Sequence, residues 1–183
     1  MRKNVLILAC ISILSFTSCT SQKTQDYTAY LFAYFEGSGE LMAQEQLRFA
    51  VSADAVHWKA LNGNRPGGIR DPHILRGEDG HTFYITATDM FTRKNGWEYN
   101  PGIVLLKSGN LTDWTHGIVD LEKSYPEKFA HIKWVWAPQT IYDPEARKYL
   151  VYFTVRFEYD TALNFYCAYA NEDFTAFENE PQL

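Results

Sequence analysis

One carboxylate in the middle of the chain stands where it could do acid-base chemistry. Asp71 follows Arg70 and precedes Pro72, just before a predicted strand over His73–Arg76. At the start of a strand its carboxylate could accept a proton from a water molecule. An aspartate before a proline is also common in turns, where it caps the backbone. The pair of residues alone leaves both roles open.

A second group of polar and aromatic side chains follows the next predicted strand. Asp89 and Phe91 end that strand, and Trp97 and Tyr99 lie in the Asn- and Gly-containing loop after it. Loops held by a rigid scaffold often build binding sites. We therefore predict that Asp89, Phe91 and Trp97 contact a ligand, although packing and solvation explain such residues equally well.

The remaining reactive side chains do not suggest a metal or a covalent mechanism. The five histidines are scattered without metal-ligand spacing, and we expect no metal and no cofactor. His73 is left out of catalysis. Cys167 lies in an apolar run typical of a buried core cysteine. Glu36, Glu158 and Asp160 are expected to be solvated.

Short runs rich in Tyr, Phe, Val and Thr must position these residues. They alternate with turn clusters, and no window keeps a 3.6-residue apolar period, so the fold class is all-β. Turns are expected at Gly77–Gly80 and Asp143–Ala146. The predicted strands are Ala29–Phe35, Gln46–Ser52, His73–Arg76, Thr82–Thr88, Ile103–Ser108, Gln139–Tyr142, Tyr149–Val155 and Phe165–Ala170.

The chain also resembles itself. The segment from Asp71-Pro72 matches the segment from Ala137-Pro138 at an offset of 66, and Ala50–Trp58 matches Leu106–Trp114 at an offset of 56. A weaker third copy runs from Tyr169 to Phe177. The implied units, Thr28–Asn62, Arg70–Leu121 and Trp134–Glu180, each read as a four-stranded blade. Repeated blades predict a β-propeller, and because closure takes about four or more, we expect a truncated one.

The residues around the two Pro motifs carry a family resemblance. Gly67-Gly68-Ile69-Arg70-Asp71-Pro72-His73-Ile74, followed by Val135-Trp136-Ala137-Pro138, resembles glycoside hydrolase family 43. That family consists of five-bladed propellers that act on arabinose- and xylose-containing glycans. The resemblance implies that residues 28–183 form about three of five blades.

The resemblance also implies roles for individual residues. Family members invert the anomeric carbon with an aspartate base from the Asp-Pro motif, a later aspartate that tunes the acid, and a glutamate acid. Asp71 matches the base. The two other acids would follow in later blades, beyond Leu183. Trp136 would stack on a sugar ring or pack between blades.

Three functions remain open at this point. The first is inverting hydrolysis of arabinosyl or xylosyl linkages in plant-type polysaccharides, with an oligo- or polysaccharide as partner. The second is a non-catalytic glycan-binding propeller of the cell envelope, and the third is a structural or protein-interaction propeller. The Asp-Pro and Trp-Ala-Pro pair favours a sugar site over the third.

The amino terminus predicts export. Residues 1–18 resemble a lipoprotein signal peptide, with basic residues, an apolar run too short to span a bilayer, and Cys19 as the lipid acceptor. Residues 19–27 would be a tether. We expect a protein on the bacterial cell envelope that contacts the membrane only through its lipid.

Composition narrows the class of partner. The chain has 183 residues, 46% of them hydrophobic, and a net charge of −5. It contains no basic run that could bind phosphates, so nucleic acid is not an expected partner. Length and hydrophobic content together predict one globular domain.

Overall fold

The computed structural model describes residues 27–37, 45–61 and 67–183, and these residues form an all-β fold. The ten strands are β1 Tyr30–Phe35, β2 Leu47–Ser52, β3 Lys59–Leu61, β4 Ile69–Arg76, β5 Phe83–Asp89, β6 Gly102–Ser108, β7 Thr115–Asp120, β8 Ile132–Asp143, β9 Lys148–Phe157 and β10 Asn164–Tyr169. The predicted fold class is confirmed.

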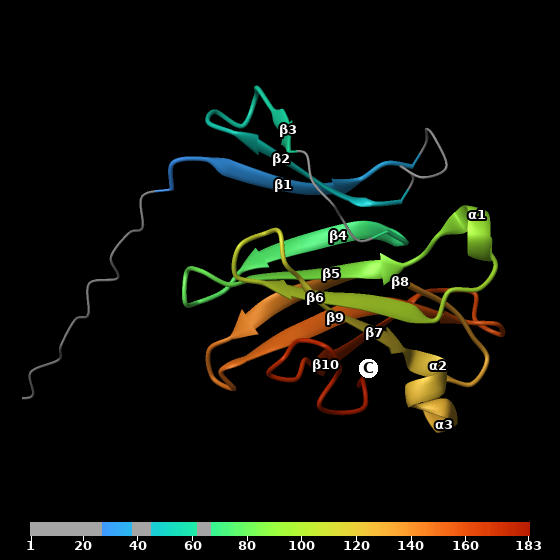
Figure 1. The fold of residues 1–183 in the computed structure, drawn as a ribbon. Helices are drawn as coiled ribbons and strands as arrows, with labels where there is room; N and C mark the ends of the chain where they lie inside the picture. Colours follow the sequence, from blue (N-terminus) through green and yellow to red (C-terminus); the bar gives the residue numbers. More distant parts are fainter. Residues whose placement is uncertain (1–26, 38–44, 62–66) are drawn as a thin grey trace, which may run out of the picture.

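The strands form three antiparallel sheets stacked face to face (Figure 1). The sheet orders are β1-β2-β3, β4-β5-β6-β7 and β8-β9-β10. Strands β4 and β8 are edge strands of their sheets, and they lie next to each other. This serial stacking of small sheets is the arrangement of neighbouring propeller blades.

The middle sheet is buried on both faces, as a blade between two neighbours must be. In β6, Ile103 and Leu105 join the hydrophobic core shared with the third sheet, while Val104 and Leu106 join the core shared with the first. Period-two alternation sends successive side chains to opposite faces. A strand with consecutive apolar residues can therefore pack on two sheets.

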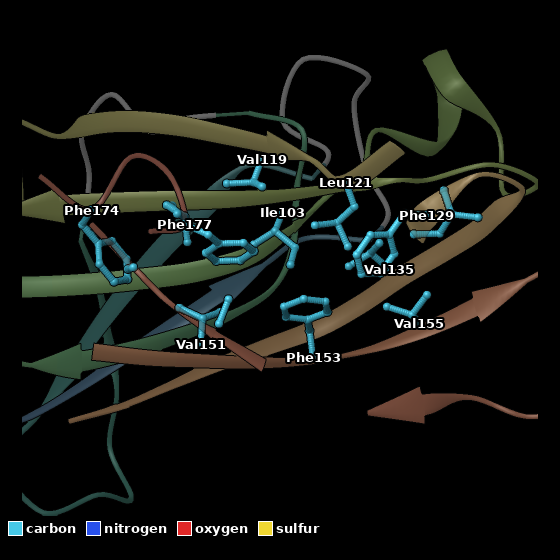
Figure 2. Close-up of a cluster of buried hydrophobic side chains, with 14 of the residues drawn as sticks. Ile103, Val119, Leu121, Phe129, Val135, Val151, Phe153, Val155, Phe174 and Phe177 are labelled. Atoms are coloured by element: carbon cyan, nitrogen blue, oxygen red, sulfur yellow. The ribbon is translucent and has the colours of Figure 1, made fainter. Parts of the chain in front are cut away.

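The core between the second and third sheets is the larger one. Figure 2 shows side chains from both sheets meeting there, including Ile103, Val151 and Phe153, together with Phe129 of the short helix that ends at this residue, and Phe174 and Phe177. Phe174 and Phe177 come from the carboxy-terminal segment, which folds back over this core. The segment thus helps to hold the two sheets together.

The internal repeat is visible in hydrogen bonds. After β2, the Ser52 hydroxyl accepts a bond from the Asp54 amide, and the Asp54 carboxylate accepts from the His57 amide. After β6, Ser108 and Asn110 make the equivalent bonds. The offset of 56 found in the sequence therefore corresponds to one repeated turn.

The number of strands per blade differs from the prediction. Only the middle sheet has four strands among the described residues. By the repeated turn, β2 is equivalent to β6 and β3 is equivalent to β7. The strands β1, β2 and β3 of the first sheet therefore correspond to the second, third and fourth strands of the middle sheet. In the third sheet the outer edge of β10 is met by single bridges to Phe177 and Gln182 instead of a strand.

Three single-turn helices complete the architecture: α1 Thr92–Asn95, α2 Leu121–Ser124 and α3 Pro126–Phe129. They lie at the end of the stack where β4 begins and β5 ends (Figure 1). The sequence did not predict them because a four-residue helix shows no apolar periodicity.

Candidate functional site

Asp71 lies in a β-bulge on the edge strand β4. The pairing of β4 with β5 shifts register between Arg70 and His73, and Asp71 has a φ of 51°. Few residues adopt this left-handed conformation, and aspartate tolerates it better than most. Its side chain is exposed and has no hydrogen-bond or ion-pair partner within the described parts of the chain. The bulge therefore presents an unpaired carboxylate to solvent.

The equivalent position one blade later has the same backbone. Ala137 has a φ of 48°, stands before Pro138, and lies where β8 shifts register against β9. The offset of 66 is thus a repeat of conformation as well as of sequence. Because Ala137 has no functional group, Asp71 alone of this pair can do chemistry.

Buried threonines of the middle sheet hold the bulge of β8. The Thr86 hydroxyl donates to the Pro138 carbonyl at 3.0 Å, and the Ala137 amide donates to the Thr88 hydroxyl at 3.0 Å. Both threonines are fully buried. A bulge leaves backbone groups without ladder partners, and these bonds satisfy them across the blade boundary.

His73 performs a similar structural task. Its Nδ1 accepts a hydrogen bond from the Thr140 amide of β8 at 3.2 Å, which requires the neutral ring to carry its proton on Nε2. Burial lowers the pKa of His73 below its ordinary value of 6.5. The side chain thus joins two blades, and the bulge between Arg70 and His73 means that strand alternation does not decide where it points.

The residue before Asp71 is anchored by a buried ion pair. Arg70 donates from Nη1 to Glu45 Oε1 at 2.9 Å, and the side chain of Glu45 is 2% exposed. The Glu45 carboxylate also accepts from the Thr92 amide at 2.7 Å and from the Thr92 hydroxyl at 2.6 Å. A buried carboxylate is stable only with such partners. This cluster ties together the first sheet, β4 and the start of α1.

Aromatic rings cover the same arginine. The Arg70 guanidinium carbon lies 4.6 Å from the centre of the Phe35 ring and 4.7 Å from that of Trp97. Trp97 is still 54% exposed. Its carbonyl accepts a hydrogen bond from the indole of Trp134 at 3.0 Å, so the loop after α1 also contacts the third sheet. The structure therefore brings the predicted Trp97 next to the Asp71 segment.

Trp136 lies farther along this set of contacts. Its ring stacks on Trp134 with centres 4.5 Å apart and planes at 12°. Trp136 and Thr154 are paired in register, and their side chains lie on the face of the third sheet opposite to that of the core residue Val155. Trp136 connects to Trp97 through Trp134, and its role in binding remains a prediction.

Asp89 and Phe91 are placed differently from Trp97. Asp89 is paired with Ile69 and packs over Gly102, where a Cβ atom would lie 2.8 Å from the Asp89 carboxylate. Ile69 belongs to the core shared with the first sheet, so Asp89 faces that sheet. Burial raises the pKa of Asp89. Phe91 is half-buried beside Gly68 and precedes α1.

Sequence reasoning missed Glu45, Arg70 and Trp134 as parts of this site. Arg70 adjoins the Asp-Pro motif, and that adjacency was the available signal. Glu45 stands 25 residues from Arg70 and 47 from Thr92, so no local spacing links the three. Trp134 was taken only as the start of a repeat unit. These side chains meet only when the sheets stack.

The other acids considered earlier have partners. Glu36 lies 3.8 Å from Arg48, Glu158 lies 3.6 Å from His131, and Asp160 accepts from Asn164 at 2.9 Å. The Glu158–His131 pair is exposed, and a surface ion pair contributes little, whereas the Arg48 side chain in the Glu36 pair is only 24% exposed. None of these acids contacts the Asp71 segment.

Two further predictions concern the cysteines. Cys19 lies outside the described residues. Cys167 is half-buried and free, so it is less buried than expected. Within residues 27–37, 45–61 and 67–183, no helix has the length and apolarity needed to cross a membrane.

An apolar hollow lies elsewhere on the molecule. It is lined by side chains that include Tyr27, Leu31, Ile74, Arg76 and Phe83, at the end of β4 opposite to Asp71. No carboxylate lines it. Because it has no carboxylate and lies at the other end of β4, this hollow is not a site for the acid-base chemistry expected of Asp71.

Comparison with known proteins gives a family and a relative. A family described as a probable glycosyl hydrolase domain matches residues 25–183. An α-L-arabinofuranosidase of Bifidobacterium longum subsp. longum is 27% identical over 95 residues, which cover 49% of this chain and 9% of that protein.

A solved structure supports the fold. The xylan β-1,4-xylosidase of Bacillus halodurans C-125 superposes with a TM-score of 0.56 at 12% identity, over 86% of this chain and 30% of that one. The chain thus spans less than a third of the length of either relative. The stacked sheets are part of a β-propeller, and the chain belongs to the family of probable glycosyl hydrolase domains related to glycoside hydrolase family 43.

Proposed function

We propose that this chain carries the general base of an inverting glycoside hydrolase, and that the base is Asp71. The observation that carries the proposal is the bulge, which leaves an exposed carboxylate without a partner among the described residues. The family match over residues 25–183 supports the reaction class. A base must be ionised and reachable by water, and the position of Asp71 fits both needs.

The chemistry divides into two roles. Asp71 takes a proton from a water molecule that attacks the anomeric carbon, while a protonated carboxyl group on the other side of the sugar donates to the leaving oxygen. In inverting enzymes the two groups stand about 6.5–9.5 Å apart, which leaves room for the water. The proposal assigns the second group to another blade, because Glu45 is held by Arg70 and Asp89 faces the first sheet.

The proposed substrates are arabinosyl or xylosyl linkages in plant-type polysaccharides. Support comes from the names of the two relatives, an arabinofuranosidase and a xylan xylosidase. The half-exposed ring of Trp97 packs on Arg70, the residue before Asp71, and offers an apolar surface on which a sugar ring can stack.

The test is turnover of arabinofuranosyl and xylopyranosyl aryl glycosides by the whole protein. We expect Asp71→Asn to lower kcat at least about 100-fold and to leave glycan affinity nearly unchanged. Asparagine is the right replacement because it also tolerates a positive φ, so the bulge is kept. The matched control is Asp173→Asn, an exposed aspartate outside the site. Equal kcat for wild type and Asp71→Asn would exclude Asp71 as the base.

We also propose that the protein is exported and anchored to the cell envelope through lipid on Cys19. The sequence of residues 1–19 supports this, because two acyl chains give stable anchoring. Cys19→Ala should move the protein from the membrane fraction to the soluble fraction, whereas Cys167→Ala should not. A Cys19→Ala protein that stays in the membrane fraction would overturn the assignment.

A further inference from the structure

The positive charge of Arg70 is neutralised by a carboxylate of the same chain. Its guanidinium is bonded to Glu45 at 2.9 Å, and its side chain is 17% exposed. Glu45 in turn is fixed by two bonds to Thr92. An arginine neutralised and buried in this way is poorly suited to binding an anionic ligand. Its free surfaces instead contact aromatic rings.

The ring of Trp97 has two unlike environments. The Arg70 guanidinium covers it from 4.7 Å, yet 54% of the residue is exposed. The backbone of Trp97 is held separately, by the bond from Trp134 to its carbonyl. Among the described residues no other aromatic ring or cation is in contact with the Trp97 ring. In the described part of the chain, Arg70 is therefore the cation that packs against the indole.

We propose that Arg70 is a positioning residue that holds the Trp97 indole as a stacking surface for the sugar ring beside Asp71. This inference rests on the proposed function and adds a means of substrate positioning to it. The buried Glu45–Thr92 cluster fixes the guanidinium, the guanidinium fixes one face of the indole, and the other face receives the apolar side of the sugar. Asp71 follows Arg70 directly, so one anchor aligns both parts.

The planar guanidinium is essential to this arrangement. It can bond to Glu45 in its own plane while stacking on rings above or below that plane, whereas a lysine ammonium cannot do both. Arg70→Lys should therefore keep the charge and lose much of the ordering of Trp97. This distinguishes positioning by shape from a purely electrostatic effect.

The first experiment measures KM and kcat of the whole protein on the best aryl glycoside. We expect Arg70→Met to raise KM about tenfold with kcat changed less than about threefold, because lost stacking weakens substrate and transition state alike. Asp71→Asn should show the opposite split. The matched control is Arg76→Met, since Arg76 lies on the same strand, donates to Gly80 and also covers aromatic rings, but at the far end.

A second variant guards against a simple loss of stability. Arg70→Met leaves the buried Glu45 carboxylate unpaired, which is destabilising. The double variant Arg70→Met/Glu45→Gln removes both charges and should recover most of the lost melting temperature. If positioning is the role of Arg70, the raised KM remains in the double variant. Recovery of KM together with stability would overturn the inference.

The second experiment reads the position of Trp97 without any activity. In protein labelled with 5-fluorotryptophan, the five tryptophans give separate ¹⁹F signals, and Trp97→Phe, Trp58→Phe and Trp114→Phe assign three of them. In the double variant the Trp97 signal should shift and report faster motion, while those of Trp58 and Trp114 stay unchanged. An unchanged Trp97 signal would refute the positioning role.

The two experiments separate the inference from the proposed function. If the wild-type protein hydrolyses no glycoside, the proposed function fails. A Trp97 signal that still depends on Arg70 would then support the positioning of the indole by Arg70. Titration with arabino- and xylo-oligosaccharides would report whether the ring binds sugar. If the Trp97 signal is the same in the wild type and in the double variant, the positioning role of Arg70 is refuted even if Asp71 proves to be the base.

Discussion

Left-handed backbone at two non-glycine residues marks the inner edge of two blades. Asp71 and Ala137 have φ values of 51° and 48°, and such a conformation costs on the order of 1–3 kcal/mol and persists only where the surroundings impose it. In both cases a proline follows. The surrounding bonds from Thr86 and Thr88 meet this cost at Ala137. At Asp71 the bulge interrupts the regular alternation of the strand, and the carboxylate is exposed to solvent.

His73 makes the molecule sensitive to mild acid. Its folded-state pKa lies below the ordinary 6.5, so below pH 6.5 the unfolded chain binds the proton more readily than the native one. Stability is therefore complete above pH 6.5 and falls as the pH drops toward the folded-state pKa. We expect the melting temperature to fall between about pH 7 and pH 5, and His73→Asn to reduce that fall.

Asparagine is suitable at position 73 because its side-chain oxygen can replace Nδ1 as the acceptor for the Thr140 amide. Thermal melts across the pH range provide the measurement. His81→Asn is the control, since His81 is exposed and its side chain lies in a turn. If both variants keep the full pH dependence, the effect arises from other groups.

At the scale of the element, the strands are closed by turns that use side chains as caps. Asp54 and Asn110 accept backbone amides after β2 and β6, and Asp79 and Asp143 do so in the predicted hairpin turns. A side-chain oxygen replaces the missing backbone partner in such turns. The cap after β2 thus recurs after β6, with Asn110 in the place of Asp54.

Gly117 lets strand β7 pack closely against the carboxy-terminal segment. A Cβ atom on Gly117 would lie 2.2 Å from the Thr175 carbonyl oxygen, and the adjoining Phe174 and Phe177 are buried and cannot move cheaply. We expect Gly117→Ala to destabilise the protein by about 1–3 kcal/mol, as for other overpacked positions.

Urea unfolding measures this change. Gly109→Ala is the control, because a Cβ atom there meets nothing within 4 Å. Comparable midpoints for the two variants would show that the carboxy-terminal segment does not pack on β7 as described.

The molecule as a whole is a stack in which each interface has its own core. Leu105 and Leu106 are adjacent and both are fully buried, but they face different neighbouring sheets. We expect Leu105→Ala and Leu106→Ala each to cost about 2–5 kcal/mol. Ile118→Ala, at a position 53% exposed, should cost less than about 0.5 kcal/mol.

Equilibrium unfolding in urea compares the three leucine and isoleucine variants. A one-sided sheet would tolerate either Leu105→Ala or Leu106→Ala. Such tolerance would contradict the assignment of the middle sheet as a blade packed on both faces.

The amino-acid sequence by itself determined the all-β class, most strand positions and the repeat, because alternation and turn residues act over a few neighbours. It also singled out Asp71 through the Asp-Pro motif. Tertiary structure alone decided that Glu45 anchors Arg70, that Trp97 lies against the guanidinium, and that Asp89 faces the first sheet. Glu45 and Arg70 are 25 positions apart, and such contacts form only when stacked sheets exclude water from between them.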